Sequence, residues 1–408
     1  MKTLTNIFYK LLITIGVLTL IVFGFGVFLY FQFTAQNEKI GRIDDINYGN
    51  TAIQIPFTYS KTNHVIVELS IDNSEKKYPF ILDSGASSML FKNSNSNFDF
   101  ETIGRAISFD AYMTPFFTKI KRIPKISISN VKATNVSFKE YEGFEKTECF
   151  ESVYGILGNT FMKHFAWLID FEGKVIYLAK EAEMLPPIPS GSYRVPLRKG
   201  GQGRNLYIDT EQFGEVSLDT GASGVCLNIE TSDSLKKKLK PQKILGNLYS
   251  AIKGHSNKVE WSESTIDSFQ LGNMLVEKLP VHLYQGNSFN LLGLAFLKKF
   301  RVYLDWKNSE MWLSPIAEKT IFTLGEFGLR FDYDEELFIS SVVENDTPYQ
   351  YGIRPGEKNI SIEGHRFKSE SEFCSFKKQL SILDTLTLNW NGEKIILTKK
   401  TFPASFLQ

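Results

Sequence analysis

The sequence predicts a mainly β protein: two similar β lobes in tandem, a small α+β domain after them, and one transmembrane helix before them. Three observations lead to this fold class: an uncharged run near the N-terminus, a long internal repeat, and a change of pattern after the repeat. The chain has 408 residues, which is more than one hydrophobic core usually holds. Its 43% hydrophobic and 22% charged residues are typical of globular proteins. The net charge of +1 gives no reason to expect nucleic acid as a partner.

The first predicted element is a helix that spans a membrane within residues 1–34. Residues 11–33, LLITIGVLTLIVFGFGVFLYFQF, carry no charge and reach the roughly 20 residues that cross a bilayer as a helix. Lys2 and Lys10 precede them, so the positive-inside tendency places the N-terminus in the cytoplasm and the lobes on the outer, periplasmic or extracellular, side. A cleaved signal peptide is the alternative, but its apolar region would be only about 7–15 residues long, and FQFTAQ is a poor cleavage site. The expected setting is a bacterial cell envelope, with the lipid bilayer as a partner.

The next feature is a repeat with an offset of 135 or 136 positions. FILDSGASSMLF, residues 80–91, matches EVSLDTGASGVCLN, residues 215–228. A second pair of segments, residues 155–179 and 290–314, matches at nearly the same offset. Two separate matches in register indicate a duplicated unit.

Each copy of the unit consists of short apolar or alternating segments separated by Gly, Asn, Ser and Pro, which is typical of strands. Residues 50–180 are therefore predicted to form the first lobe and residues 205–315 the second. Residues 181–204 are rich in Pro and Gly and are predicted to connect the lobes.

Each lobe has one aspartate at the end of an apolar strand, Asp83 in the first and Asp219 in the second. Taken alone, Asp-Ser-Gly or Asp-Thr-Gly at a strand end is typical of a turn. Two related lobes packed about a pseudo-twofold axis would bring these turns face to face, and two carboxylates about 3 Å apart share one proton. One carboxylate can then act as a base toward a water while the other protonates a carbonyl oxygen.

The residues after each aspartate fit this role. Ser84 and Thr220 each provide a hydroxyl that can form a hydrogen bond across the interface between the lobes. Gly85 and Gly221 allow a tight turn and direct backbone N–H groups at the carboxylates. These four residues are predicted to support the active-site loops.

The pattern resembles the aspartic peptidase superfamily of pepsin and the retroviral proteases. The resemblance rests on Asp83-Ser84-Gly85-Ala86 and Asp219-Thr220-Gly221-Ala222, and on the later Ile156-Leu157-Gly158 and Leu291-Leu292-Gly293. Alanine after the glycine makes each lobe look more like a retroviral, retropepsin-like monomer than half of pepsin. The resemblance implies hydrolysis of peptide bonds by a water held between the two aspartates, with no covalent intermediate, no cofactor and no metal.

The resemblance also implies a flap from each lobe over the substrate. The candidate in the first lobe is residues 108–120, which include Tyr112. The candidate in the second lobe is residues 245–261. No motif anchors either assignment.

Other chemistries lack their motifs. GASSM and GASGV do not fit the G-x-S-x-G turn of serine hydrolases, and the five dispersed histidines include no H-E-x-x-H zinc motif. The three cysteines, Cys149, Cys226 and Cys374, are too few and too scattered for a disulfide framework or a thiolate metal site. Asp170 and Asp305 also repeat, but each ends a strand before turn formers and is predicted to close a hairpin.

The pattern changes within residues 324–402, where FGLRF precedes a strand, the segment TPYQYGIRPGEKNISIEG and a helix-like SESEFCSFKKQL. This region resembles a bacterial PDZ domain. The resemblance implies that the loop Gly328, Leu329, Arg330 and Phe331 binds the C-terminal carboxylate of a peptide, which adds a strand to the sheet edge. The alternative is a small β domain that only packs on the lobes.

The combined hypothesis is a membrane-anchored aspartic endopeptidase whose PDZ-like domain recruits peptide or protein substrates. The main alternative is a catalytically inactive protein on the same scaffold that binds peptides through the PDZ-like domain.

Overall fold

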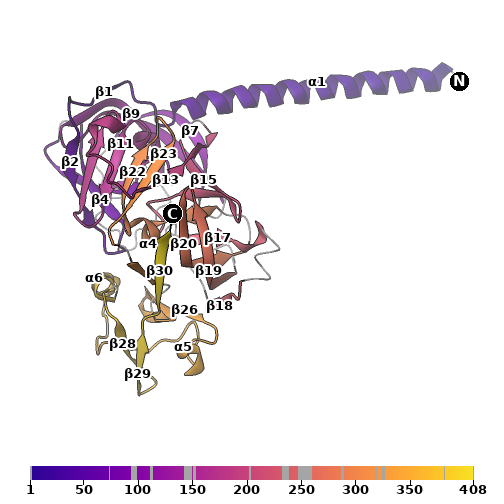
Figure 1. The fold of residues 1–408 in the computed structure, drawn as a ribbon. Coiled ribbons are helices and arrows are strands. Elements are labelled where there is room, and N and C mark those ends of the chain that lie inside the picture. Colours follow the sequence, from indigo (N-terminus) through magenta and orange to yellow (C-terminus); the bar gives the residue numbers. More distant parts are fainter. Residues whose placement is uncertain are drawn as a thin grey trace.

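The structure is a computed structural model that describes residues 2–407 except 73, 93–98, 111–113, 142–148, 150–152, 202–203, 232–238, 247–259, 286–288, 318, 324–326 and 381 (Figure 1). Strands hold 51% of the residues and helices 15%, so the prediction of a mainly β chain is confirmed. We call residues 50–180 the first half, residues 205–315 the second half and residues 324–402 the C-terminal module.

The first half supplies most of one sheet. Its strands are β1 (Asp45–Asn47), β3 (Thr58–Tyr59), β4 (Val65–Ile71), β5 (Lys77–Asp83), β6 (Met89–Phe91), β7 (Glu101–Phe109), β8 (Pro115–Ile128), β9 (Val131–Tyr141) and β10 (Gly155–Gly158). They follow the order β1-β9-β6-β10-β5-β4-β8-β7, with β3 beside β4. Apolar alternation explains strands such as β4, in which Val65, Val67, Leu69 and Ile71 are fully buried. Its central feature is the parallel pair β5 and β10, which places Gly158 opposite Asp83.

The second half repeats this arrangement. Its strands are β14 (Arg198–Lys199), β15 (Leu206–Thr210), β16 (Gly214–Leu218), β17 (Val225–Asn228), β18 (Gln242–Gly246), β19 (Trp261–Leu271), β20 (Met274–Tyr284) and β21 (Asn290–Leu292). They follow the order β14-β15-β16-β21-β17-β20-β19-β18. The parallel pair β16 and β21 corresponds to β5 and β10. A short helix follows each inner strand, α2 (Asn159–Met162) in the first half and α4 (Leu294–Leu297) in the second.

A third sheet joins the two halves. Its strands are β2 (Ile53–Pro56), β11 (Ala166–Asp170), β12 (Val175–Ala179), β13 (Tyr193–Pro196), β22 (Phe300–Asp305) and β23 (Glu310–Pro315). At its centre β11 of the first half pairs antiparallel with β22 of the second, with Leu168 opposite Tyr303. Asp170 Oδ1 accepts a hydrogen bond from the Gly173 N–H at 2.9 Å, and Asp305 Oδ1 accepts one from the Asn308 N–H at 3.1 Å. The prediction that these two aspartates close hairpins is confirmed.

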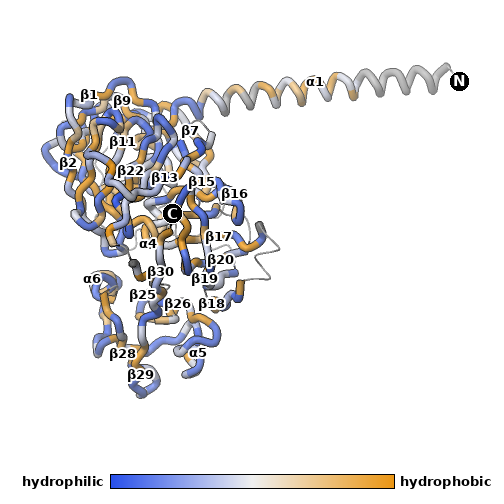
Figure 2. The backbone as a smooth tube through the Cα atoms, in the orientation of Figure 1, coloured by the Kyte–Doolittle hydropathy of each residue, from blue (hydrophilic) through white to orange (hydrophobic). Residues whose placement is uncertain are grey.

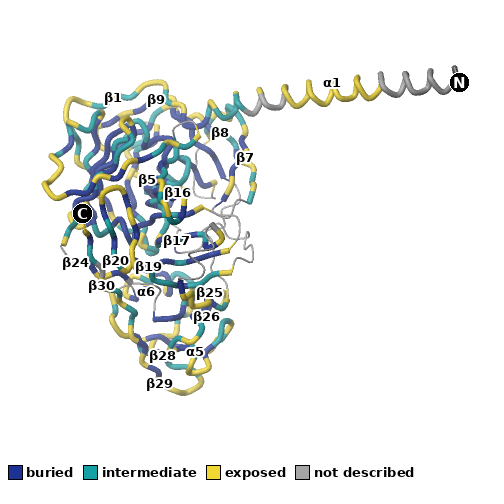
Figure 3. Tube along the Cα trace, turned by 45° about the vertical axis from the view of Figure 1, so that its right-hand side comes forward, coloured by how far each residue is buried: buried dark blue, intermediate teal, exposed yellow. Residues whose placement is uncertain are grey.

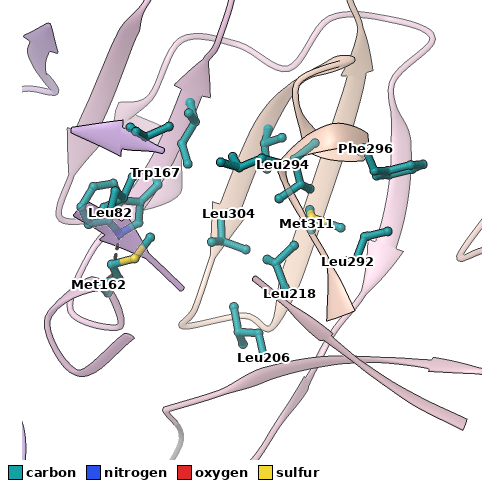
Figure 4. Close-up of a cluster of buried hydrophobic side chains, with 14 of the residues drawn as sticks. Leu82, Met162, Trp167, Leu206, Leu218, Leu292, Leu294, Phe296, Leu304 and Met311 are labelled. Atoms are coloured by element: carbon teal, nitrogen blue, oxygen red, sulfur yellow. Dashed lines mark hydrogen bonds between the residues drawn. The ribbon is translucent and has the colours of Figure 1, made fainter. Parts of the chain in front are cut away.

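The three sheets share a core that crosses from one half to the other. Figure 4 shows Leu82 and Trp167 of the first half on one side of Leu304, and Leu218 and Leu292 of the second half on the other; all of these residues are almost completely buried and belong to one cluster. The buried indole N–H of Trp167 donates a hydrogen bond to the Met162 carbonyl at 2.8 Å. In Figure 3 the buried segments run through the middle of both halves, and the exposed ones lie at the outer loops. The repeated units are therefore packed as one body rather than as two separate domains.

The C-terminal module and the strands that flank it follow. Their elements are β24 (Lys319–Thr323), β25 (Leu329–Asp334), β26 (Glu336–Val343), α5 (Thr347–Gln350), β27 (Ser361–Ile362), α6 (Glu370–Leu380), β28 (Thr385–Trp390), β29 (Glu393–Thr398) and β30 (Thr401–Leu407). The module has a core of its own, which includes Leu329, Ile339, Phe373 and Leu388. Figure 1 shows α5, α6, β28 and β29 gathered on one side of the two halves.

Two kinds of link attach the module. Strand β26 pairs antiparallel with β18, so the sheet of the second half continues into the module. A disulfide between Cys149 and Cys374 joins the first half to α6. The sequence did not predict this bond, because 225 positions separate the two cysteines and no local pattern relates them.

The N-terminal helix α1 (Lys2–Lys39) extends away from the sheets in Figure 1, and its last turn contacts β7 through a hydrogen bond from Lys39 Nζ to the Ile103 carbonyl at 2.9 Å. In Figure 2 most outer loops are hydrophilic, whereas hydrophobic segments lie in the strands between them. The prediction of a single-pass membrane protein with its lobes on the outer side is wrong: no helix in the described part of the chain is long and apolar enough to cross a membrane.

Candidate active site

Each candidate aspartate stands where a buried strand ends in a tight turn. In β5 the apolar residues Phe80 and Leu82 are anchored in the core, and the strand stops at Asp83. The Asp83 Oδ1 atom accepts hydrogen bonds from the backbone N–H groups of Gly85 at 2.9 Å and Ala86 at 3.0 Å. A short carboxylate side chain that accepts from N–H groups two and three residues later stabilises such a turn.

The second half has the same turn after β16. The Asp219 Oδ1 atom accepts hydrogen bonds from the N–H groups of Gly221 at 2.8 Å and Ala222 at 3.0 Å. The two aspartates thus have the same local environment in the two halves. In each case one carboxyl oxygen is held by backbone donors.

The two turns face each other across the interface of the halves. A Cβ atom added to Gly85 would lie 2.5 Å from the carboxyl carbon of Asp219, and one added to Gly221 would lie 2.3 Å from that of Asp83. Each glycine therefore lies directly against the aspartate of the other half, and no larger residue fits there. This crossed arrangement brings Asp83 and Asp219 together, as the duplication predicted.

Ser84 and Thr220 hold the two loops together by four hydrogen bonds. Thr220 Oγ1 donates to the Leu82 carbonyl at 2.9 Å and accepts from the Ser84 N–H at 2.9 Å. Ser84 Oγ donates to the Leu218 carbonyl at 2.8 Å and accepts from the Thr220 N–H at 3.0 Å. Both side chains are buried, so these bonds are shielded from water and fix the relative position of the loops.

The electrostatics of the pair favour one shared proton. Burial and the neighbouring Asp219 carboxylate raise the pKa of Asp83 well above its usual range, and a hydrogen bond with Asp219 raises it further. Burial also raises the pKa of Asp219, although hydrogen bonds from Gly221, Asp83 and Ala222 oppose this shift. Because two adjacent, partly buried carboxylates cannot both ionise easily, the pair keeps a proton at pH values where an isolated aspartate would have lost it.

The two later glycines of the motif lie behind the aspartate loops. A Cβ atom on Gly158 would lie 2.1 Å from the Ala86 carbonyl oxygen, and one on Gly293 would lie 2.3 Å from that of Gly224. The first residue of each short helix then binds the loop, with the Asn159 N–H donating to Ala86 and the Leu294 N–H donating to Ala222, both at 2.8 Å. The glycines are therefore needed for close backbone packing beneath the site.

A residue that the sequence did not single out also reaches the site. His64, in the first half, forms a hydrogen bond with the backbone of Gly221, in the second half, and its Nδ1 atom lies 2.8 Å from Thr62 Oγ1. Burial lowers the pKa of His64 to about 4, so the imidazole is neutral over most of the pH range. A lone histidine in a turn carries no sequence signal for this contact, because it depends on how the halves pack.

The predicted flaps fall partly outside the described residues. In the first half β7 and β8 form a hairpin with Ile107 opposite Phe117, but its tip at residues 111–113, which includes Tyr112, lies outside them. Phe117 is 83% exposed, an unusual position for a large apolar side chain. Most of the second candidate, residues 247–259, also lies outside the described part of the chain.

The predicted carboxylate-binding loop lies at the start of β25. Leu329 and Phe331 point into the core of the C-terminal module, and Gly328 has a positive φ of 76° beside Asp346. Arg330 instead reaches the second half, where its Nη2 atom lies 3.0 Å from Nε2 of His282.

A group of potential metal ligands occurs at Cys149, Glu370 and Cys374. The two sulfur atoms are bonded to each other, which leaves neither as a thiolate ligand. This group therefore offers no ordinary metal site in the oxidised protein.

Comparison with known proteins does not identify a family. No family model matches the sequence, and no curated protein matches it. Among solved structures, the chain is similar to the crystal structure of basic 7S globulin from soybean, with a TM-score of 0.41 and 10% sequence identity over 65% of this chain and 95% of that one. A likeness this distant assigns no function, which has to be inferred from the residues of the site.

Proposed function

We propose that this protein is an aspartic endopeptidase in which Asp83 and Asp219 activate a water for hydrolysis of a peptide bond. The observation that carries the proposal is the crossed pair of aspartate turns, with each glycine against the opposite carboxyl group. The raised pKa of Asp83 supports it, because the reaction needs one protonated and one ionised carboxyl group at the same time.

The reaction follows from this protonation state. The ionised carboxylate takes a proton from the water as the water oxygen attacks the carbonyl carbon, and the protonated carboxyl group donates its proton to the carbonyl oxygen. The resulting tetrahedral intermediate breaks its C–N bond when the carboxyl group that took the water proton donates it to the amide nitrogen, while the other, now ionised, carboxylate takes a proton from a hydroxyl group of the intermediate; the products are a carboxylic acid and an amine, and the pair again holds one proton. The backbone donors on Oδ1 of each aspartate keep both carboxyl groups oriented through these steps.

The finer fold assignment belongs to the same proposal. Each half is taken as a lobe of the retropepsin-like kind, and the C-terminal module as a PDZ-like domain that recruits protein substrates. The repeated parallel pairs, β5 with β10 and β16 with β21, support the first assignment. In the described residues β25 is the last strand of its sheet, so a peptide could add to its free edge. This edge supports the assignment of the C-terminal module as a PDZ-like domain.

Replacement of either aspartate by asparagine tests the proposal. We expect Asp83→Asn and Asp219→Asn each to lower the hydrolysis of quenched-fluorescence peptides by at least about a thousandfold, because asparagine cannot supply the acid and base roles. Asp267, an exposed residue of β19, provides the matched control, and Asp267→Asn should retain full activity. Full hydrolysis by either dyad variant would refute the proposal.

The alternative remains a catalytically inactive protein that binds peptides through the module. The free edge of β25 is the observation that favours it. A statine-type transition-state mimic distinguishes the two functions: a rise in Tm that disappears in Asp83→Asn supports the peptidase, whereas no rise in the wild-type chain supports the alternative.

A further inference from the structure

The face of the first half that bears Asp83 is distinct from its core face. Alternate residues of a strand point to opposite faces, and in β5 Phe80 and Leu82 belong to the shared core. Ile81 therefore lies on the same face as Asp83, where it packs in a separate apolar cluster with Met89 and Ile156. A substrate held at Asp83 would have to lie along this face.

One residue of α6 in the C-terminal module reaches that face. Cys374 of α6 is completely buried and belongs to the same apolar cluster as Ile81 and Met89, as does its disulfide partner Cys149. Ile81 is only 7% exposed and Met89 only 8%. The apolar cluster beside Asp83 thus includes a residue of the module.

The module also reaches the corresponding face of the second half. In β17 Val225 and Leu227 belong to the shared core, so Cys226 lies on the opposite face. Cys226 is paired with His282 of β20, and Arg330 of the module contacts that histidine. A Cβ atom added to Gly224, which follows the Asp219 turn, would lie 3.2 Å from Nδ1 of His282, so the histidine that Arg330 contacts borders the loop of the second aspartate.

The two attachments of the module differ in kind. On the side of the second half, β24 and β30 pair with each other where the chain enters and leaves the module, β30 pairs with β20, and β26 pairs with β18. These backbone ladders form a broad base. On the side of the first half, the covalent attachment is the single bond between Cys149 and Cys374.

We propose that the C-terminal module is an autoinhibitory cover over the two aspartates, with its hinge on the second half and the Cys149–Cys374 disulfide as a latch on the first. The inference deepens the proposed peptidase function and rests on it. Reduction by a dithiol opens the latch: one thiolate of the dithiol attacks a sulfur of the bridge and displaces the other cysteine as a thiolate. The second thiolate then resolves the mixed disulfide, so the dithiol is oxidised and the protein gains two thiols.

The test uses the full-length chain and two native reporters. Met89 lies in the apolar cluster that Cys374 of the module joins, whereas Met311 and Met274 are completely buried in the shared core. Oxidation of these methionines by hydrogen peroxide is followed by mass spectrometry, and peptide hydrolysis is measured in parallel. The samples are the oxidised chain, the same chain with dithiothreitol, and the Cys149→Ser/Cys374→Ser double variant with and without dithiothreitol.

We expect both unlatched forms to show about a tenfold increase in Met89 oxidation and in peptide hydrolysis, with the core methionines unchanged. Dithiothreitol should not change Met89 oxidation or peptide hydrolysis of the double variant. Its effect on the wild-type chain would then come from reduction of the Cys149–Cys374 bond. If Met311 is also oxidised in the double variant, that variant has lost its fold, and the reduced wild-type chain decides by the same criteria.

Unchanged Met89 oxidation after reduction would overturn the cover, and so would equal, measurable hydrolysis by latched and unlatched forms that differ in Met89 oxidation. The proposed function fails in a different way. If Met89 becomes accessible but no form hydrolyses any peptide, the hinged cover is supported and the peptidase proposal is refuted.

Discussion

Replacement of Thr220 by valine should weaken the contact between the two aspartate loops. Valine keeps the shape of threonine but removes both hydrogen bonds of the hydroxyl group, to the Leu82 carbonyl and from the Ser84 N–H, each 2.9 Å long. Thr220 is 2% exposed, so water cannot easily replace the lost partner. A buried polar group deprived of its partner costs about 1–3 kcal/mol, and two groups lose theirs, so we expect the free energy of unfolding to fall by about 2–6 kcal/mol.

The related variant Ser84→Ala removes the equivalent pair of bonds, to the Leu218 carbonyl and from the Thr220 N–H. Because the interface is pseudo-symmetric, its loss of stability should be of similar size. Thr58→Val is the control, since Thr58 is exposed on β3, and it should change stability by less than about 0.5 kcal/mol.

Urea unfolding of the oxidised chain, followed by tryptophan fluorescence and by circular dichroism, measures these differences. Coincident transitions with both probes would validate the free energies. If Thr220→Val and Ser84→Ala are both as stable as Thr58→Val, the four hydrogen bonds do not hold the halves together, and the rigid placement of the aspartates needs another cause.

Two pH-dependent predictions concern buried groups. Because the pKa of Asp83 is raised in the folded state, its contribution to stability is complete below the unfolded pKa and is lost as the pH rises through the folded value. Asp83→Asn should therefore have a higher Tm than the wild type at pH 8 but not at pH 3, and an equal Tm at pH 8 would contradict the like-charge repulsion. His64 has a folded pKa of about 4, below its unfolded value of 6.5, so the wild type should lose stability as the pH falls from 6.5 to 4. In thermal melts, the Tm of His64→Gln should fall less than that of the wild type over this pH range. An equal fall in Tm for both chains would show that His64 does not cause the loss of stability.

Much of the candidate site could be predicted from sequence because its signals are local. The apolar residues before Asp83 predict a strand that ends there, and the two residues after it predict a tight turn; the structure has both. The same holds for Asp219 and its turn. The regular offset between the copies also predicted that these turns would meet, since duplicated units tend to pack symmetrically.

The N-terminal helix shows where a local signal misled. Its uncharged run predicted a membrane crossing, but no helix in the described residues meets the length and apolarity that a crossing requires. The role of the loop of Gly328 to Phe331 in binding a carboxylate stays a prediction; what the sequence did not indicate is that Arg330 contacts His282 of the second half.

Sequence alone determined the mainly β class, the two aspartate turns and the residues that support them, because strand periodicity and turn chemistry act over a few neighbouring positions. Tertiary structure alone decided that His64 contacts Gly221, that Arg330 contacts His282, and that Cys149 is bonded to Cys374. These contacts join residues 48 to 225 positions apart. No local pattern encodes such a pairing, since it arises only when separately formed sheets bury their apolar faces against one another.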